Sequence, residues 1–300
     1  MVRSALLFLG CSLWVAASAQ AAPLELPKRT PTPSAGHQAS ITAPEYAGSD
    51  VHHLLYLPPD WRPDWRERGL SWPVIVEYTG NRYPAAGSTG TVEGAALGYG
   101  ISGGRYIWIV LPYISADHKS NAPTWWGDVE ATVEYAKTNV PRACLEFGGN
   151  REQVFLCGFS RGAIGVNFLG LHDDEIAQLW CGLISHDHYD GVREWKGTTW
   201  GSPLDQYRQR AGERLKRLGK RPALISQAGS TRDIRDYLEG HFDPETVTFV
   251  DVQMQRIFPE FPNDWAIHPH NDRWLLHDSP ERTVIWTWVE SVLDSGVESR

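Results

Sequence analysis

The sequence has 300 residues, of which 42% are hydrophobic and 21% charged, and this composition excludes the disordered and fibrous classes of protein. Its length is enough for one domain with a large buried core, or for two domains at most. The 36 acidic residues outnumber the 28 basic ones, and the basic ones form no long run, so nucleic acid is not an expected partner.

The N-terminal segment has the pattern of an export signal. Arg3 supplies a positive charge, the residues from there to Ala17 are mostly apolar, and small residues stand at Ala19 and Ala21, where a signal peptidase would read them. The apolar stretch is shorter than the roughly 20 residues that a membrane span requires. We therefore expect residues 1–21 to be a signal peptide cleaved near Ala21, and the protein to be secreted or periplasmic with no membrane span.

Residues 22–47, which follow this signal, are rich in Pro, Ala, Ser and Thr. Such a composition favours a flexible or extended lead-in with little core of its own. The apolar runs of a folded domain begin after this segment, so residues 48–300 are expected to form that domain.

Short apolar runs and helical patterns then alternate along the chain. The runs that predict β-strands are Val51–Leu57, Pro73–Tyr78, Tyr106–Leu111, Val154–Cys157, Cys181–Ser185, Pro222–Ser226 and Val247–Val252. Helical periodicity is clearest at 129–136, 204–218 and 280–292. Because apolar runs without polar alternation are typical of strands buried on both faces, the pattern predicts an α/β fold with a mostly parallel central sheet and helices on both faces.

The pattern Gly-x-Ser-x-Gly, which can carry a nucleophilic serine, occurs twice, around Ser102 and around Ser160. The chemistry requires a strand, a sharp turn at the serine and then a helix, so that the hydroxyl emerges above the sheet. Ser160 follows the strand Val154–Cys157 and precedes an apolar helical segment, whereas Ser102 precedes a strand and is predicted to be a loop serine. We therefore predict that Ser160 is a catalytic nucleophile.

A serine nucleophile needs a base and a carboxylate that orients the base. With this motif the chain order is serine, acid, histidine, and the base is expected between the last strand and the last helix. His270 is the preferred base there, with His268 as the alternative. For the acid we prefer Asp233, the first carboxylate after the strand Pro222–Ser226, while Asp187, after the preceding strand, is the rival.

The oxyanion formed during acyl transfer requires preorganised N–H donors. One is expected to be the amide of Arg161, directly after the nucleophile. The other is expected to be the amide of Gly80 or Asn81, in the loop after an early strand. The Arg161 side chain fits either an acidic substrate or a salt bridge that braces the turn.

Two further groups of residues are expected to line the substrate cleft. His186, Asp187 and His188 form a polar cluster after a late strand, and no metal is expected there because the sequence does not identify a third ligand. Trp125 and Trp126 stand at a loop-to-helix boundary, and exposed indoles stack on sugar or aromatic faces, although core packing is the alternative. The same expectation extends to the loop tryptophans Trp195, Trp200, Trp265 and Trp274.

The chain has four cysteines, and loss of the signal would leave Cys144, Cys157 and Cys181. Export exposes them to oxidising conditions, so one disulfide and one remaining thiol are compatible with the sequence, which does not choose the pair. Their spacing lacks the CxxC pattern of metal sites.

The segment from Gly158 to Gly162, with His270 ahead of a final helix, resembles exported esterases of the α/β-hydrolase superfamily. These are the feruloyl and acetyl-xylan esterases and polyhydroxybutyrate-depolymerase-like proteins. The resemblance runs from about residue 50 to the end. The serine followed by arginine also resembles glucuronoyl esterases, which have Cys in the place of Phe159. The resemblance implies the α/β-hydrolase fold and hydrolysis of a small-molecule or polysaccharide-linked ester through an acyl-enzyme, without a cofactor.

Two other functions share this scaffold. A serine peptidase of the prolyl-oligopeptidase type has the same catalytic domain, but fewer than 50 residues would precede the predicted sheet after signal removal, too few for its β-propeller. A non-catalytic binding protein is the other alternative. We expect a secreted carboxylesterase that acts on carbohydrate-linked or aromatic esters.

Overall fold

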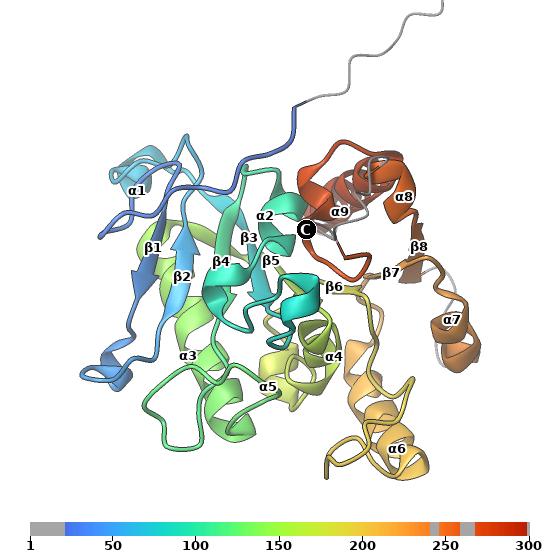
Figure 1. Ribbon diagram of the computed structural model, residues 1–300. Coiled ribbons are helices and arrows are strands. Elements are labelled where there is room, and N and C mark those ends of the chain that lie inside the picture. Colours follow the sequence, from blue (N-terminus) through green and yellow to red (C-terminus); the bar gives the residue numbers. More distant parts are fainter. Residues whose placement is uncertain (1–21, 241–245, 259–267, 299–300) are drawn as a thin grey trace, which may run out of the picture.

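A computed structural model describes residues 22–240, 246–258 and 268–298, so the expected signal peptide and Trp265 lie outside the described residues. The described residues build one eight-stranded sheet with helices packed against it (Figure 1). The strands are β1 (Gln38–Ile41), β2 (His53–Tyr56), β3 (Trp72–Tyr78), β4 (Ile107–Leu111), β5 (Gly149–Phe159), β6 (Gly182–His186), β7 (Ala223–Ala228) and β8 (Val247–Val252).

The strands lie in the order β1-β2-β4-β3-β5-β6-β7-β8. β2 runs antiparallel to both of its neighbours, while all the remaining pairs are parallel. The seven apolar runs correspond to β2 through β8, so the predicted mostly parallel sheet is confirmed. Because parallel strands end at the same edge of the sheet, the loops after β3, β5 and β6 meet there.

Helices cover both faces of this sheet (Figure 1). The α-helices are α1 (Trp65–Arg68), α2 (Leu97–Ser102), α3 (Val129–Phe147), α4 (Arg161–Phe168), α5 (Asp174–Ala177), α6 (Leu204–Leu215), α7 (Arg232–Leu238), α8 (Met254–Ile257) and α9 (Pro280–Glu298). Val133 of α3 packs in one core with Val74 of β3, whereas Ile101 of α2 and Ile285 of α9 share a second core with the next strand residue, Ile75. This alternation explains why β3 reads as a continuous apolar run. Among the described helices, none combines the length and the hydrophobicity that crossing a membrane requires.

The segment expected to be a flexible lead-in contributes an edge strand. Within it, Gln38–Ile41 form β1, which pairs antiparallel with β2. Further upstream, the backbone N–H of Leu24 donates to the carbonyl oxygen of Leu276 at 2.7 Å. Only two of the four residues of β1 are apolar, so little in the sequence indicated a strand. It is a strand because it pairs with β2.

The three described cysteines are free thiols. Cys144 lies in α3, Cys157 in β5, and Cys181 directly before β6. None of the disulfide pairs that the sequence allowed is therefore formed among them. Burial raises the pKa of Cys144 to about 11, which keeps this thiol protonated and unreactive.

Candidate active site

The sharp turn predicted at Ser160 joins β5 to α4. Ser160 has φ 55° and ψ −114°, a conformation that is strained for a residue with a side chain. The flanking glycines are required by space: a Cβ on Gly158 would lie 2.2 Å from the carbonyl oxygen of Gly162. A Cβ on Gly162 would lie 1.8 Å from the carbonyl oxygen of Tyr78. The backbone of β5 can therefore make this turn only with glycine at both positions.

The second serine motif has a different surrounding. Ser102 is the last residue of α2 rather than a loop residue, and it is fully buried. Its hydroxyl donates to the carbonyl oxygen of Tyr99 and accepts from the N–H of Gly104, both at 3.0 Å. Ser102 therefore closes the end of a helix.

A chain of hydrogen bonds leads from Ser160 into the protein. The Oγ of Ser160 lies 2.9 Å from Nε2 of His270. On the other side of the same ring, Nδ1 of His270 lies 3.0 Å from Oδ2 of Asp187. This is the geometry of a nucleophile, a base and an orienting carboxylate.

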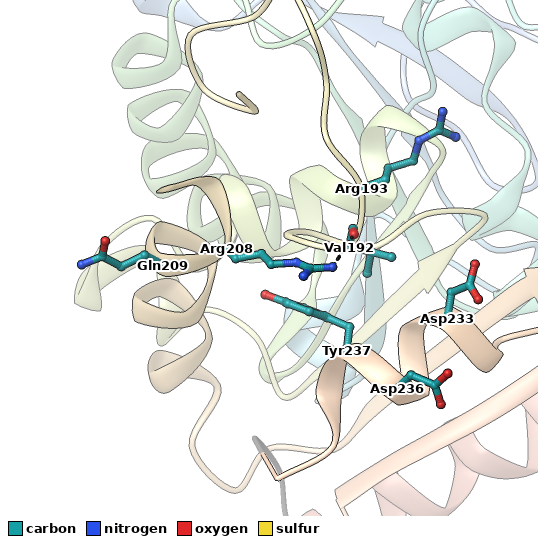
Figure 2. Close-up of a pocket in the computed structure, with 7 residues that line it drawn as sticks. All are labelled: Val192, Arg193, Arg208, Gln209, Asp233, Asp236 and Tyr237. Carbon is teal, nitrogen blue, oxygen red and sulfur yellow. Dashed lines mark hydrogen bonds between the residues drawn. The ribbon is translucent and has the colours of Figure 1, made fainter. Parts of the chain in front are cut away.

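The structure places Asp187, and not the preferred Asp233, against His270. Asp187 directly follows β6, which is the neighbour of β5 in the sheet, so its loop starts beside Ser160. Asp233 follows β7, one strand further away, and lies exposed in the first turn of α7. Figure 2 shows Asp233 on α7 beside Asp236 and Tyr237, at the wall of another cavity. The order of residues along the chain allows either carboxylate as the partner of His270. The order of strands in the sheet places only Asp187 beside it.

The carboxylate of Asp187 is buried and held from several sides. Its Oδ1 accepts hydrogen bonds from the N–H of Ala228 at 2.5 Å and from Nε2 of Gln227 at 3.1 Å. Burial alone would raise the pKa of Asp187, but His186 and the hydrogen bonds from His270 and Ala228 outweigh it, so the pKa lies below its usual value. Asp187 is therefore ionised at neutral pH, as an orienting carboxylate must be.

His186 and Asp187, which were expected to line the cleft, are both fully buried instead. Nδ1 of His186 lies 2.9 Å from Oγ of Ser226, and Nε1–H of Trp274 donates to its Nε2 at 3.0 Å. Burial lowers the pKa of His186, so the ring is neutral. His186 therefore packs behind the site and holds the strand ends together. The reason is its position: it is the last residue of β6, before the chain turns at Asp187 with φ 60°.

A cavity of about 490 Å³ opens at Ser160. Its walls include both histidines of the 268–270 segment and residues from four other segments of the chain: Asn81, Trp125, Arg161, His188, Arg193 and Trp195. The alternative base, His268, is one of these walls, and its Nδ1 accepts the backbone N–H of His270 at 3.0 Å. His268 thus supports the loop that carries His270.

The tryptophans divide between the cavity and the core. Trp125 and Trp195 line the cavity, with their ring centroids 5.0 Å apart. Trp126, expected in the cleft, is buried and stacks on Phe168 at 4.8 Å. Trp274 is also buried, whereas Trp200 packs against Trp125 and Trp126. The core-packing alternative therefore holds for Trp126 and Trp274, because Trp126 packs on Phe168 and Trp274 packs on the buried ring of His186.

Backbone N–H groups lie beside Ser160. Arg161 is the first residue of α4, so its N–H has no acceptor within the helix. Gly80 is close enough that a Cβ there would lie 3.3 Å from Cβ of Ser160. Asn81 lines the same cavity, and its Oδ1 accepts the N–H of Trp125 at 2.7 Å, which fixes the loop. These positions suit donors to an oxyanion.

The Arg161 side chain is buried and binds backbone carbonyl groups. Its guanidinium donates to the carbonyl oxygens of Trp125 at 2.7 Å, Gly80 at 2.9 Å and Gly90 at 3.2 Å, and lies 3.8 Å over the ring of Tyr113. Within the described part of the chain no carboxylate pairs with it, so the expected salt bridge is replaced by carbonyl groups. Burial lowers the pKa of Arg161 to about 10, which leaves it cationic at neutral pH. Arg161 therefore ties two loops, the one between β3 and α2 and the one between β4 and α3, to the turn at Ser160.

No protein-family model and no curated protein matches this sequence. Solved structures match in fold. A sugar hydrolase from Lactococcus lactis has a TM-score of 0.54 and 14% identity, over 87% of this chain and 100% of that one. One of two fungal esterases from Rhizomucor miehei has a TM-score of 0.51 and 15% identity, over 92% and 87%. A truncated carbohydrate esterase from gut microbiota has a TM-score of 0.51 and 11% identity, over 87% and 98%.

At these identities the similarity concerns the fold. Together with the strand order and the turn at Ser160, it confirms the predicted α/β-hydrolase fold, with its mostly parallel sheet and helices on both faces.

Proposed function

We propose that this protein is a serine hydrolase that cleaves carboxylic esters through an acyl-enzyme. The observation that carries the proposal is a chain of hydrogen bonds from Ser160, at the wall of a cavity, through His270 to the buried Asp187. Asp187 takes the role for which the sequence favoured Asp233. The esterases among the solved structures of the same fold agree with this choice of reaction.

The reaction follows from the positions of the atoms. Nε2 of His270 accepts the proton of Ser160 as its Oγ attacks the ester carbonyl carbon. The N–H groups of Arg161 and of Gly80 or Asn81 stabilise the oxyanion of the tetrahedral intermediate. Its collapse breaks the bond to the alcohol oxygen, which takes the proton from His270 and leaves. Water, deprotonated by the same ring, then attacks the acyl carbon. The bond from this carbon to Oγ of Ser160 breaks, Oγ takes the proton back from His270, and the carboxylic acid leaves.

The substrate we propose is a carbohydrate-linked or aromatic ester, met outside the cytoplasm. Trp125 and Trp195 present indole rings to the cavity, and such rings stack on sugar and aromatic faces. A sugar hydrolase and a carbohydrate esterase among the solved structures of this fold favour the same class. Export rests on the N-terminal signal pattern of residues 1–21.

The proposal is tested with a fluorophosphonate probe and p-nitrophenyl acetate. Wild type should be labelled and turn over the ester, and Ser160→Ala and His270→Ala should both lose label and turnover. Asp187→Asn should lower kcat by about 10³- to 10⁴-fold, because an amide favours the wrong tautomer of His270. Asp174→Asn, an exposed change on α5, is the matched control and should behave as wild type.

Each outcome has a consequence. Absence of labelling in correctly folded wild type would favour the binding protein, and cleavage of peptides but not of esters would favour the peptidase. A larger loss in Asp233→Asn than in Asp187→Asn would return the acid to Asp233.

A further inference from the structure

The cavity at Ser160 is lined by positive charge. Three arginines stand at its walls, Arg82, Arg161 and Arg193, and no aspartate or glutamate is among the described residues that line it. The whole chain has a formal net charge of −8 at pH 7, so the cavity differs in sign from the molecule around it. Because a cleft lined by charges of one sign concentrates ligands of the opposite sign, these walls favour an anionic ligand.

Of the three arginines, Arg161 is the buried one, and it acts on the cavity through its charge. Its three guanidinium nitrogens all donate to backbone carbonyl oxygens, over distances of 2.7 to 3.5 Å, so they are not available to a ligand. A buried charge is screened less than an exposed one. Arg161 therefore adds positive potential to the space beside Ser160 without contacting what enters it.

Arg193, in the loop after β6, is exposed and available to a ligand. Its guanidinium lies 4.9 Å from the ring centroid of Trp195, and it has no hydrogen bond or ion pair among the described residues. Asp233 shares two neighbouring cavities with Arg193, but Figure 2 shows the Arg193 side chain pointing away from α7, which carries Asp233. The carboxylate next in sequence, Glu194, accepts the hydroxyl of Ser202 at 2.7 Å. The charge of Arg193 is therefore left for a ligand.

Arg82 lines the same cavity from the loop after β3. Its backbone N–H donates to the carbonyl oxygen of Pro123 at 3.1 Å, which holds the residue in place, while its side chain is exposed. Like Arg193, its guanidinium has no hydrogen bond or ion pair within the described ranges. Two unpaired cations from separate loops therefore line one cavity.

His188 adds a neutral hydrogen-bonding group to the wall near Arg193. Its ring centroid lies 5.2 Å from that of Trp195, on which Arg193 packs. Burial lowers the pKa of His188 to about 3, and the charges of His270 and Arg193 act in the same direction, so the ring is neutral at pH 7 and keeps one N–H donor. A ligand that accepts hydrogen bonds from Arg193 can therefore also accept one from His188.

These groups define a ligand by its chemistry. A guanidinium group binds a carboxylate well, because two parallel N–H groups match its two oxygens. A neutral ligand would displace water from these cations without replacing its hydrogen bonds, whereas a carboxylate replaces them. We propose that the ester cleaved at Ser160 carries a free carboxylate besides its ester group, and that Arg193 and Arg82 bind this carboxylate. This inference rests on the proposed ester hydrolysis and adds the charge of the substrate and the residues that select it.

The test compares pairs of esters in which a carboxylate is replaced by an uncharged primary amide. In the first pair, monoethyl adipate and ethyl adipamate, this group ends the acid part of the ester. In the second, 3-acetoxybenzoate and 3-acetoxybenzamide, it stands on the alcohol part. In wild type, kcat/KM for the carboxylate should exceed that for the amide at least tenfold in one of the pairs, mainly through KM, and that pair shows which part of the substrate carries the charge. Raising the salt concentration from about 0.05 M to about 0.5 M should reduce this ratio, because exposed charges are screened.

Variants of the two exposed arginines remove the charges one at a time. Arg193→Gln and Arg82→Gln should each lower the carboxylate-to-amide ratio severalfold, and the double variant should abolish the preference. Arg193→Lys keeps the charge and should retain more of the ratio than Arg193→Gln does. Arg62→Gln, the same change at an exposed position ahead of α1 and outside this cavity, is the matched control and should keep the wild-type ratio. Thermal unfolding of each variant checks that the fold is kept.

The outcomes separate the charge of the substrate from the reaction. Equal kcat/KM for carboxylate and amide in both pairs overturns the inference, as does a ratio in the double variant equal to that in Arg62→Gln. Wild type that hydrolyses p-nitrophenyl acetate but neither carboxylate ester overturns it too, while ester hydrolysis stands. Wild type that hydrolyses no ester and takes no fluorophosphonate label overturns the proposed function itself.

Discussion

Glu77 is a carboxyl group buried at the centre of the sheet, on the strand that leads to the Gly80 loop. Its Oε2 accepts the N–H of Gly98 at 2.7 Å and Nε1–H of Trp108 at 2.9 Å, while Oε1 has no partner among the described residues. Burial and the repulsion from Asp272 raise the pKa of Glu77 from 4.5 to about 8, against the effect of these hydrogen bonds. In the folded protein at pH 7 this side chain is therefore mostly protonated and neutral.

A raised folded pKa makes stability fall as the pH rises. Between pH 4.5 and pH 8 the folded state keeps the proton of Glu77 and the unfolded state does not, so the free energy of unfolding drops by about 1.4 kcal/mol for each pH unit. From pH 5.5 to pH 8.5 this one group removes about 3 kcal/mol. Glu77→Gln does not ionise and keeps an oxygen for the two donors. Relative to wild type, it should gain about 3 kcal/mol between these pH values.

Urea unfolding followed by tryptophan fluorescence at pH 5.5 and pH 8.5 measures this difference. Glu67→Gln, an exposed change on α1, is the control and should follow the pH dependence of wild type. If Glu77→Gln loses stability with pH as steeply as wild type does, Glu77 is already ionised in the folded protein and the reasoning is refuted.

Two further predictions concern the nucleophile turn. Gly162→Ala should destabilise the fold by about 3 kcal/mol or more, because its Cβ would collide with the carbonyl oxygen of Tyr78. Gly212→Ala in α6, where a Cβ meets open space, should instead stabilise the fold by about 0.5–1 kcal/mol. Thermal unfolding compares the two variants, and equal effects would contradict the steric argument. Arg161→Lys should lower kcat/KM for p-nitrophenyl acetate at least tenfold, because one ammonium group does not reach all three carbonyl groups. Wild-type turnover in Arg161→Lys would mean that these loops hold their places without it.

The elements that the sequence predicted well are those whose signal is local. A buried parallel strand is a continuous apolar run, so β2 through β8 could each be located, although β5 begins at Gly149 and not at Val154. The two serine motifs were told apart by the order of strand and helix around each, because only Ser160 has a strand before it. β1 was missed for the opposite reason: its four residues form a strand because β2 offers an edge beside them.

What the sequence could not decide depends on neighbours in space. The choice between Asp187 and Asp233 required the strand order, which places β6 and not β7 next to β5. The sequence did hold a clue, because Asp187 directly follows β6, the strand next to β5, which leads to Ser160. The carbonyl partners of Arg161 come from residues 36 to 82 positions away, and the Gly-x-Ser-x-Gly motif around Ser160 gives no indication of them.

The ties between Arg161 and the carbonyl groups of Gly80, Gly90 and Trp125 limit how this protein could be redesigned. Each of these loops borders the cavity or supports a residue that does, so each would be a natural place to exchange segments for a new specificity. Because one guanidinium binds all three carbonyl groups, a graft that shifts the backbone at one of them disturbs the other two. Segments of the loop between β6 and α6 lack this restraint and are the better starting point for such exchanges.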